Sequence, residues 1–282
     1  MIETQKMNYE KATKNIRAEL KSYIEKNNIK SLVIGISGGI DSAICAVLAK
    51  PVCDELGIQL HGRSITIGNS TDEVDRAADI GKSFCHTFDE VYNMYNLFTT
   101  VWSLVKTEGW EVEDPNEKIR MGNVKARLRM IYLYDLAQIH KGMVLSTDNW
   151  TEYLLGFWTL HGDVGDYGMI QELWKTEVYE LSEWLVENEL VQEKAQALQN
   201  CIDCQATDGL GISKTDLDQI MPGWIGSSKD GYKEVDERLA LYTRFGRGDL
   251  DDPVIQRSIA THFKRNNPTN IGRFTIEGEH GI

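Results

Sequence analysis

Hydrophobic positions follow two periods along the chain, the three-to-four spacing of amphipathic helices and the short apolar runs of buried strands. The predicted strands are residues 32–36, 58–67 and 142–146. The predicted helices are residues 9–28, 43–56 (starting near Ile40), 71–83, 91–105, 121–140, 175–190, 235–242 and 253–264. Strands that alternate with helices predict an α/β fold: a doubly wound, mostly parallel sheet with helices on both faces, Rossmann-like in arrangement.

Breaks in this pattern set the boundaries of the elements. The sequence STDE at residues 70–73 is a capping box that opens the following helix. Residues 107–117 are acidic and contain a proline, which predicts an exposed loop. Residues 205–222 lack periodicity and are expected to form an irregular covering loop. The segment from about residue 266 to the end is broken by one proline and three glycines, which predicts a tail.

The first strand leads into SGGIDS at residues 37–42, where two glycines and an acid lie between two serines. Glycines let backbone N–H groups close on anionic oxygens, the serines add hydroxyl donors, and the next helix points its positive end at the same anion. Asp41 would repel a phosphate, so its predicted role is to hold Mg²⁺. The spacing is neither G-x-x-x-x-G-K-[ST] nor G-x-G-x-x-G. It indicates a site for a pyrophosphate that leaves.

Composition narrows the possible partners. The 282 residues include 43 acidic and 30 basic side chains, a net charge of −13, which disfavours nucleic acid and anionic membranes. The longest strongly apolar stretch, residues 43–49, is too short to span a bilayer, and the N-terminus lacks the apolar core of a signal peptide. We therefore expect a cytoplasmic protein in which residues 1–282 form one domain.

Five cysteines fit reduced thiols better than a disulfide framework. Cys201 and Cys204 have C-x-x-C spacing, as in half of a zinc site or in a redox pair. Because the sequence has no second pair to complete a tetrahedral site, two ordinary thiols are the favoured interpretation.

Polar residues cluster after the strand at residues 142–146, in the sequence TDNWTE at 147–152. Ligands of an α/β sheet bind beyond the carboxyl ends of its strands, so Glu152 is a second predicted Mg²⁺ ligand opposite Asp41. Asp163 and Asp166 follow in a glycine-containing loop that, taken alone, favours a plain turn. Lys175 starts a helix against the preference of the helix dipole, which suggests a nearby ligand.

The helix predicted at residues 121–140 begins with Lys125, Arg127 and Arg129 before it turns apolar. Basic first turns of this kind fit either an anionic ligand or a solvated face, and the segment alone leaves both possibilities open. The helix at residues 91–105 carries a stripe of aromatic side chains, which favours core packing or a subunit contact.

Several blocks in the same order resemble the ammonia-dependent NAD synthetases, one branch of the pyrophosphatase-loop (N-type ATP pyrophosphatase) enzymes. The blocks are residues 32–42, 122–130, 146–157, 159–166, 175–181 and 263–265 before Pro268. With the spacings between them they cover most of the chain. The resemblance implies an adenine-nucleotide α-hydrolase-like fold. It also implies a homodimer that converts deamido-NAD to NAD with ATP, Mg²⁺ and ammonia, through an adenylated intermediate that releases AMP and pyrophosphate.

The resemblance also assigns roles to residues by position. It implies ATP contacts from Gly35, Ile36, Ser37, Gly38, Gly39, Ile40, Asp41, Ser42, Arg63, Thr147, Lys175 and Thr207. It implies Mg²⁺ ligation by Asp41 and Glu152. It implies deamido-NAD contacts from Arg127, Leu160, Asp166, Phe263 and Lys264. The implied catalytic residues are Asp163, where ammonia is received, Asp166 and Lys175.

Three features depart from the family pattern. Leu160 stands where a lysine often contacts substrate, the loop at residues 162–166 is one residue shorter than GDGGxD, and the covering loop after Thr207 is compact. Two other classes stay open: a tRNA-modifying or sulfur-inserting enzyme with the same loop, and a non-catalytic ATP-binding sensor. No glutamine-hydrolysing domain fits beside the synthetase pattern, so ammonia itself is the expected nitrogen donor.

Overall fold

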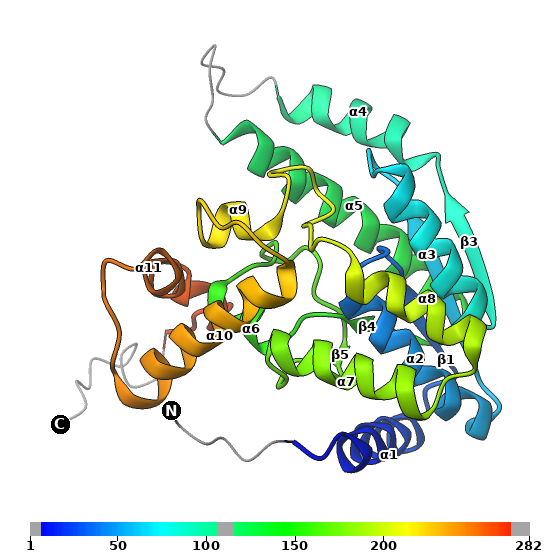
Figure 1. The fold of residues 1–282 in the computed structure, drawn as a ribbon. Coiled ribbons are helices and arrows are strands. Elements are labelled where there is room, and N and C mark those ends of the chain that lie inside the picture. The colour runs from blue at the N-terminus through cyan, green and yellow to red at the C-terminus, as the bar shows by residue number, and fades with distance from the viewer. Residues whose placement is uncertain (1–6, 107–115, 272–282) are drawn as a thin grey trace.

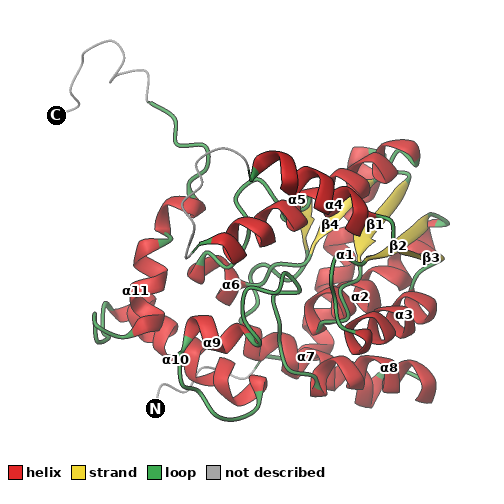
Figure 2. Cartoon of the chain, turned by 90° about the horizontal axis from the view of Figure 1, so that it is seen from above, coloured by secondary structure: helices red, strands yellow, loops and turns green. Residues whose placement is uncertain are grey.

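The computed structural model describes residues 7–106 and 116–271, and its centre is a five-stranded parallel sheet (Figures 1 and 2). The strands are β1 (Ser31–Gly35), β2 (Gln59–Ile65), β3 (Thr87–Val91), β4 (Met143–Ser146) and β5 (Tyr167–Gly168). Their order is β3-β2-β1-β4-β5, so the chain reverses its direction of winding between β1 and β4. The carboxyl ends of these two strands therefore form the switch point at which such sheets bind ligands.

Helices cover both faces of the sheet, as predicted (Figure 1). They are α1 (Tyr9–Asn27), α2 (Ile40–Leu56), α3 (Thr71–Phe84), α4 (Met94–Val105), α5 (Glu117–Ile139), α6 (Trp150–Leu155), α7 (Lys175–Asn188), α8 (Gln192–Asp203), α9 (Asp216–Ile220), α10 (Ser228–Phe245), α11 (Pro253–Ala260) and the 3₁₀ helix η1 (His262–Arg265). Alternate residues of β1 serve the two faces. Leu32 and Ile34 lie in the larger core with α2 and α7, and Val33 lies in the smaller core with α4 and α5.

The predicted start of α3 is confirmed in atomic detail. The Ser70 hydroxyl accepts from the Glu73 backbone N–H, and the Glu73 carboxylate accepts from the Ser70 N–H. The helix after the glycine loop begins at Ile40, as expected, and ends at Gly57, whose φ of 65° suits glycine. These helix ends could be predicted from the sequence because each depends on residues that are close together in the chain.

The prediction was wrong at the edge of the sheet. Residue 91 ends a strand, β3, instead of starting a helix, and the two-residue β5 was not predicted. β3 carries Asp89 and Glu90, charges that an edge strand tolerates because only one neighbour pairs with it. The helix α8 was also not predicted. It packs against α3 and α7, so its formation depends on tertiary contacts.

Several boundaries also differ from the predicted ones. Helix α10 begins at Ser228, where Ser227 caps it, instead of at residue 235. The covering loop contains the short helix α9, and the helix predicted through residue 264 divides into α11 and η1. Helix α5 begins at Glu117, and most of the acidic loop predicted before it lies outside the described residues. Residues 266–271 form no helix or strand, and the rest of the predicted tail also lies outside the described residues.

Two further observations bear on the predictions from composition. Within residues 7–106 and 116–271, no helix is both long enough and apolar enough to cross a bilayer. All five cysteines are free thiols.

Candidate active site

The glycine loop lies between β1 and α2, at the switch point of the sheet. Gly38 has a φ of +84°, and a Cβ there would stand 2.2 Å from the Glu73 carbonyl oxygen, so only glycine fits. Ser37 and Ser42 are joined by a hydroxyl–hydroxyl contact of 3.1 Å. Gly39, directly before α2, has no side chain that could cap the helix, which leaves the N–H groups of its first turn available to an anion.

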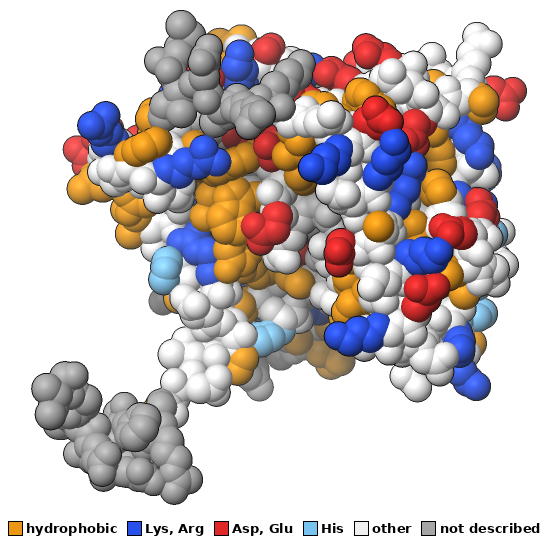
Figure 3. All heavy atoms as spheres, turned by 90° about the horizontal axis from the view of Figure 1, so that it is seen from below, with side chains coloured by type: hydrophobic (Ala, Val, Ile, Leu, Met, Phe, Trp, Pro, Cys, Tyr) orange, Lys and Arg blue, Asp and Glu red, His pale blue; other side chains and the backbone are white. Residues whose placement is uncertain are grey.

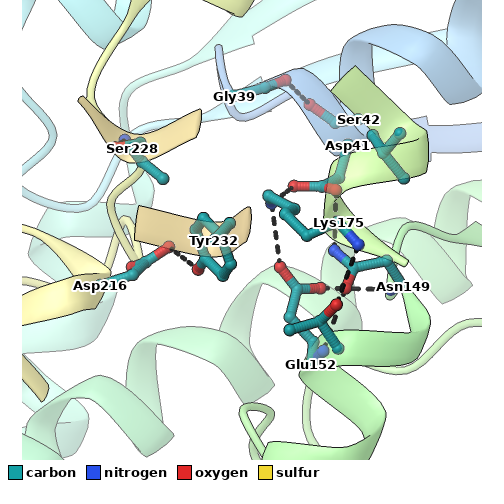
Figure 4. Close-up of polar contacts among 12 residues, drawn as sticks. Gly39, Asp41, Ser42, Asn149, Glu152, Lys175, Asp216, Ser228 and Tyr232 are labelled. Carbon is teal, nitrogen blue, oxygen red and sulfur yellow. Dashed lines mark hydrogen bonds and ion pairs between the residues drawn. The ribbon is translucent and has the colours of Figure 1, made fainter. Parts of the chain in front are cut away.

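Lys175 joins the two predicted metal ligands (Figure 4). Its ammonium contacts Asp41 Oδ2 and lies 3.2 Å from Glu152 Oε1, although the three residues come from α2, α6 and α7. The side chain is only 1% exposed. The two carboxylates that face Lys175 thus explain why a cation can stand at the N-terminus of this helix.

Burial and neighbouring charges shift the pKa values of Glu152 and Lys175. Burial raises the pKa of Glu152, whereas the neighbouring Lys175 ammonium opposes the shift. Burial would lower the pKa of Lys175, but the carboxylates of Asp41 and Glu152 outweigh it and hold that pKa well above its ordinary value. The lysine is therefore a fixed positive charge at neutral pH.

Asn149 orients both carboxylates, and the sequence prediction did not include it. Its side-chain amide donates to Asp41 Oδ1 at 2.9 Å, and its backbone N–H donates to Glu152 Oε2 at 3.3 Å. Its side-chain oxygen accepts from the Glu152 N–H, which completes a capping box at the start of α6. The Asn-x-x-Glu spacing at residues 149–152 was the signal that could have identified it.

Two adjoining cavities lie at this edge of the sheet. The first, of about 370 Å³, is lined by the glycine loop, by Thr147 and Thr207, and by the Lys175 triad. The second, of about 760 Å³, includes Arg127 and Leu160. Four residues line both cavities: Met130, Asp148, Trp158 and Lys264. The two cavities therefore meet at one carboxyl group and one ammonium group.

Two half-buried carboxyl groups line the first cavity, and that of Asp148 also lines the second. Asp163 Oδ1 accepts from the Thr159 N–H at 2.8 Å, and burial raises the pKa of Asp163. Asp148 Oδ2 accepts from the Ser146 hydroxyl at 2.6 Å, and burial raises the pKa of Asp148 to about 7. Asp148 was not predicted, although its place directly after β4 was a signal for it.

Residues 207–210 of the covering loop are attached to α3 and α5 by side-chain hydrogen bonds. The Thr207 hydroxyl donates to Glu73 Oε1 at 2.6 Å, and Arg129 donates to the Gly209 carbonyl at 2.9 Å. Lys125 donates to the Leu210 carbonyl at 2.8 Å. Two basic residues of α5, Lys125 and Arg129, thus contact the covering loop rather than open solvent.

Two basic residues that line the second cavity, Arg127 and Lys264, contact backbone oxygens. Arg127 donates to the Leu160 carbonyl at 2.9 Å, and Lys264 donates to the carbonyls of Gly156 and Trp158 at 2.7 and 2.6 Å. In the described part of the chain, both cations therefore bind backbone oxygens in the wall of the cavity, and neither belongs to an ion-pair network.

The structure does not bring three other predicted residues to the centre of the site. Arg63 lines the first cavity, but its guanidinium pairs with Asp89 at 3.0 Å on the neighbouring strand. Asp166 is absent from the lining of both cavities, because its carboxylate accepts from the Val144 N–H and the Tyr134 hydroxyl. Phe263 is 59% exposed.

Cys201 and Cys204 line the first cavity as free thiols. Burial raises the pKa of Cys201 to about 12 and also raises the pKa of Cys204. Both therefore stay protonated at neutral pH and are weak nucleophiles. In the described part of the chain, no group of three or more His, Cys, Asp and Glu residues forms a metal cage.

The chain matches the family described as NAD synthase over residues 12–268. It is 33% identical over 229 residues to the NH₃-dependent NAD(+) synthetase of Mycoplasma genitalium, covering 80% of this chain and 88% of that one. The chain belongs to the NAD synthase family.

Solved structures agree on the fold. The NMN synthetase of Francisella tularensis superposes with a TM-score of 0.73 at 21% identity, covering 95% of this chain and 100% of that one. The NH₃-dependent NAD synthetase of Campylobacter jejuni, in complex with nitrate, gives 0.68 at 22% identity, covering 94% and 100%. The predicted α/β fold is thereby confirmed.

Membership of the NAD synthase family makes the protein a C–N ligase of NAD biosynthesis that uses ATP. It sets aside a tRNA-modifying or sulfur-inserting enzyme. On the face shown in Figure 3, acidic and basic side chains are interspersed, which differs from the basic surface that a tRNA-modifying enzyme would need.

Proposed function

We propose that this NAD synthase family member amidates deamido-NAD to NAD with ammonia, using ATP and releasing AMP and pyrophosphate through an adenylated intermediate. The observation that carries the proposal is the pair of adjoining cavities, one built around the glycine loop and Lys175 and the other beyond their junction. The first suits a nucleoside triphosphate. The second gives room for the other half of a dinucleotide.

The first cavity offers ATP a polar cradle. The proposed contacts are the backbone of residues 35–42, the hydroxyls of Thr147 and Thr207, Arg63 and the ammonium of Lys175. Attack on the α-phosphorus spreads negative charge over oxygens, which a fixed cation and oriented N–H groups stabilise without covalent help. Lys175 is suited to this role because its charge persists at neutral pH.

Asp41 and Glu152 are the proposed Mg²⁺ ligands. Both are carboxylates on one cation, and Mg²⁺ in nucleotide sites is held by one or two carboxylates together with substrate phosphates, so the donor set fits. When bound, Mg²⁺ would neutralise charge on the triphosphate. Asn149 already fixes one oxygen of each carboxylate, which keeps both groups oriented.

The second cavity is the proposed site of the substrate dinucleotide. Arg127 and Lys264 supply positive charge, Leu160 contributes its backbone, and Tyr153 and Trp158 present parallel rings 5.7 Å apart. Asp166 and Phe263 stay proposed contacts of this side. Asp163 is the proposed receiver of ammonium, since a half-buried carboxylate attracts the cation and can take its proton.

We further propose a homodimer whose contact includes α5. Ile131 and Tyr134 of this helix are 64% and 40% exposed and also line the second cavity. A partner there would cover apolar surface beside the substrate. We also propose that residues 1–282 act as one domain, with a tail from about residue 266, and that the protein works in the cytoplasm, where free thiols persist.

The proposal is tested by incubating the full chain with ATP, Mg²⁺, deamido-NAD and either ammonium or glutamine. The expected result is equal amounts of NAD and AMP with ammonium, and little product with glutamine alone. Nicotinate mononucleotide is the control acceptor, and it should be poorer because it leaves the second cavity partly empty. Release of ADP, or preference for the mononucleotide, would contradict the proposal.

A further inference from the structure

A buried carboxyl group of α10 contacts the first turns of α6 and α7, the helices that carry Glu152 and Lys175. Asp236 is 6% exposed. Its Oδ1 accepts from the Thr151 hydroxyl at 2.5 Å, and its Oδ2 accepts from the backbone N–H and the hydroxyl of Thr176 at 2.9 and 2.8 Å. Thr151 directly precedes Glu152 in α6, and Thr176 directly follows Lys175 in α7.

Thr151 extends this contact to Lys175 itself. Its hydroxyl oxygen accepts from the Lys175 backbone N–H at 2.9 Å while it donates to Asp236. The first N–H groups of a helix have no partner inside the helix, and a negative charge beside them is favourable. Trp174, which precedes α7, has no side-chain oxygen to satisfy them. Asp236 therefore caps α7 from a distant part of the chain.

The same face of α10 also reaches the other end of Lys175. Tyr232 lies one helical turn before Asp236, and its ring centroid is 5.1 Å from the Lys175 ammonium. The Tyr232 hydroxyl donates to Asp216 at 3.0 Å, which fixes the ring (Figure 4). Helix α10 thus reaches Lys175 at two points. The Tyr232 ring lies beside its ammonium, and Asp236 is linked to its backbone N–H through the Thr151 hydroxyl.

We propose that Asp236 is a positioning residue of the ligase site, which holds the first turns of α6 and α7 so that Glu152 and Lys175 both meet Asp41. The proposal rests on the proposed function for its kinetic test. A buried carboxyl group is costly unless it is hydrogen-bonded, and Asp236 has three donors from the two helices that it joins. A displacement of about 1 Å at a reacting group can lower the rate about 100-fold.

The first experiment is Asp236→Asn, which keeps the size of the side chain but turns one acceptor into a donor. We expect kcat for NAD formation to fall about 10- to 100-fold while the KM for deamido-NAD stays within about twofold. The half-saturating Mg²⁺ concentration should rise, because Glu152 is displaced.

Two controls separate positioning from loss of stability. Glu237→Gln makes the same charge change at the next, exposed residue and should leave kcat unaltered. Ile24→Ala removes buried volume in α1, away from the site, and should lower the melting temperature without a comparable fall in kcat. Wild-type kcat in Asp236→Asn, or a fall no larger than that of an equally destabilised Ile24→Ala protein, would overturn the proposal.

A second pair of variants tests the link through Thr151. Thr151→Val removes the hydroxyl and should lower kcat as Asp236→Asn does, whereas Thr151→Ser keeps the hydroxyl and should restore most of kcat. Equal kcat values for the two variants would count against the link.

The proposed function can fail independently of this proposal. If the wild-type chain makes no NAD, the proposed function is wrong, and Asp236 is then judged by calorimetry of ATP binding at increasing Mg²⁺. A higher Mg²⁺ requirement in Asp236→Asn than in the wild type supports the positioning role, and an equal requirement overturns it.

Discussion

Around Lys175, on the proposed ATP side of the site, charged side chains contact one another, whereas Arg127 on the proposed dinucleotide side contacts backbone carbonyls. Lys175 joins Asp41 and Glu152 in a buried cluster that Asn149 orients. Arg127, by contrast, donates to a carbonyl at the rim of the second cavity. The cluster around Lys175 is therefore preorganised for charge stabilisation, whereas Arg127 has no carboxylate among its described partners to hold its charge. Substitutions should lower kcat on the first side and raise KM on the second.

The largest effect is expected for Asp41→Asn. It removes a carboxylate that faces Lys175 and that is the proposed first ligand of Mg²⁺, so NAD formation should fall more than about 1,000-fold. The measurement is the rate of pyrophosphate release at saturating ATP. Asp54→Asn, at the far end of the same helix, should stay active. Near-normal release from Asp41→Asn would remove this residue from the site.

A smaller but still large effect is expected for Gly38→Ala. The new Cβ would collide with the Glu73 carbonyl, and the φ of +84° would be strained, so the loop must move and kcat/KM for ATP should fall about 100-fold. Gly57→Ala is the matched control. Its φ is also positive, but nothing lies within 4 Å of the new Cβ, so it should cost stability alone. Equal kinetic losses in both variants would show that strain, not the loop position, is responsible.

On the dinucleotide side, Arg127→Ala should raise the KM for deamido-NAD about tenfold with kcat nearly unchanged, because it removes one charge-assisted contact. Steady-state kinetics with deamido-NAD as the varied substrate measure this. Lys118→Ala, an exposed residue of the same helix, is the control. A fall in kcat at constant KM would mean that the two sides do not differ as described.

The smallest effect is expected for Leu160→Lys, which introduces a cation at the wall of the second cavity. Because the position is half-buried at the cavity wall, the added cation should lower the KM for deamido-NAD by less than about fivefold. Leu160→Met controls for side-chain length. A tenfold or larger decrease in the KM for deamido-NAD would mean that the second cavity lacks a strong contact at this position and that its other contacts do not replace it.

The same contrast explains what the sequence could predict. The glycine loop and the capping box at Ser70 depend on local motifs, and the approach of Asp41 and Glu152 to one cation depends on strand ends that share one edge of the sheet. The place of Lys175 at a helix N-terminus indicated a nearby ligand, but its ion pairs with Asp41 and Glu152 were not predicted. These features are expressed in short stretches of sequence.

The features that were missed depend on residues far apart in the chain. Strand β3 exists because β2 offers a pairing edge, and α8 exists because α3 and α7 cover it. Asp236 meets Thr151 across 85 positions, and no local pattern marks it. The prediction for Arg63 did not anticipate Asp89 beside it, because β3 itself was not predicted. Tertiary contacts decided each of these.

Pyrophosphate exchange tests the central claim most directly. Labelled pyrophosphate, ATP, Mg²⁺ and deamido-NAD are incubated with the protein in the absence of ammonia. If the first cavity activates the substrate by adenylation, label should enter ATP only when deamido-NAD is present. Exchange without deamido-NAD, or no exchange from a preparation that forms NAD when ammonium is added, would contradict the account.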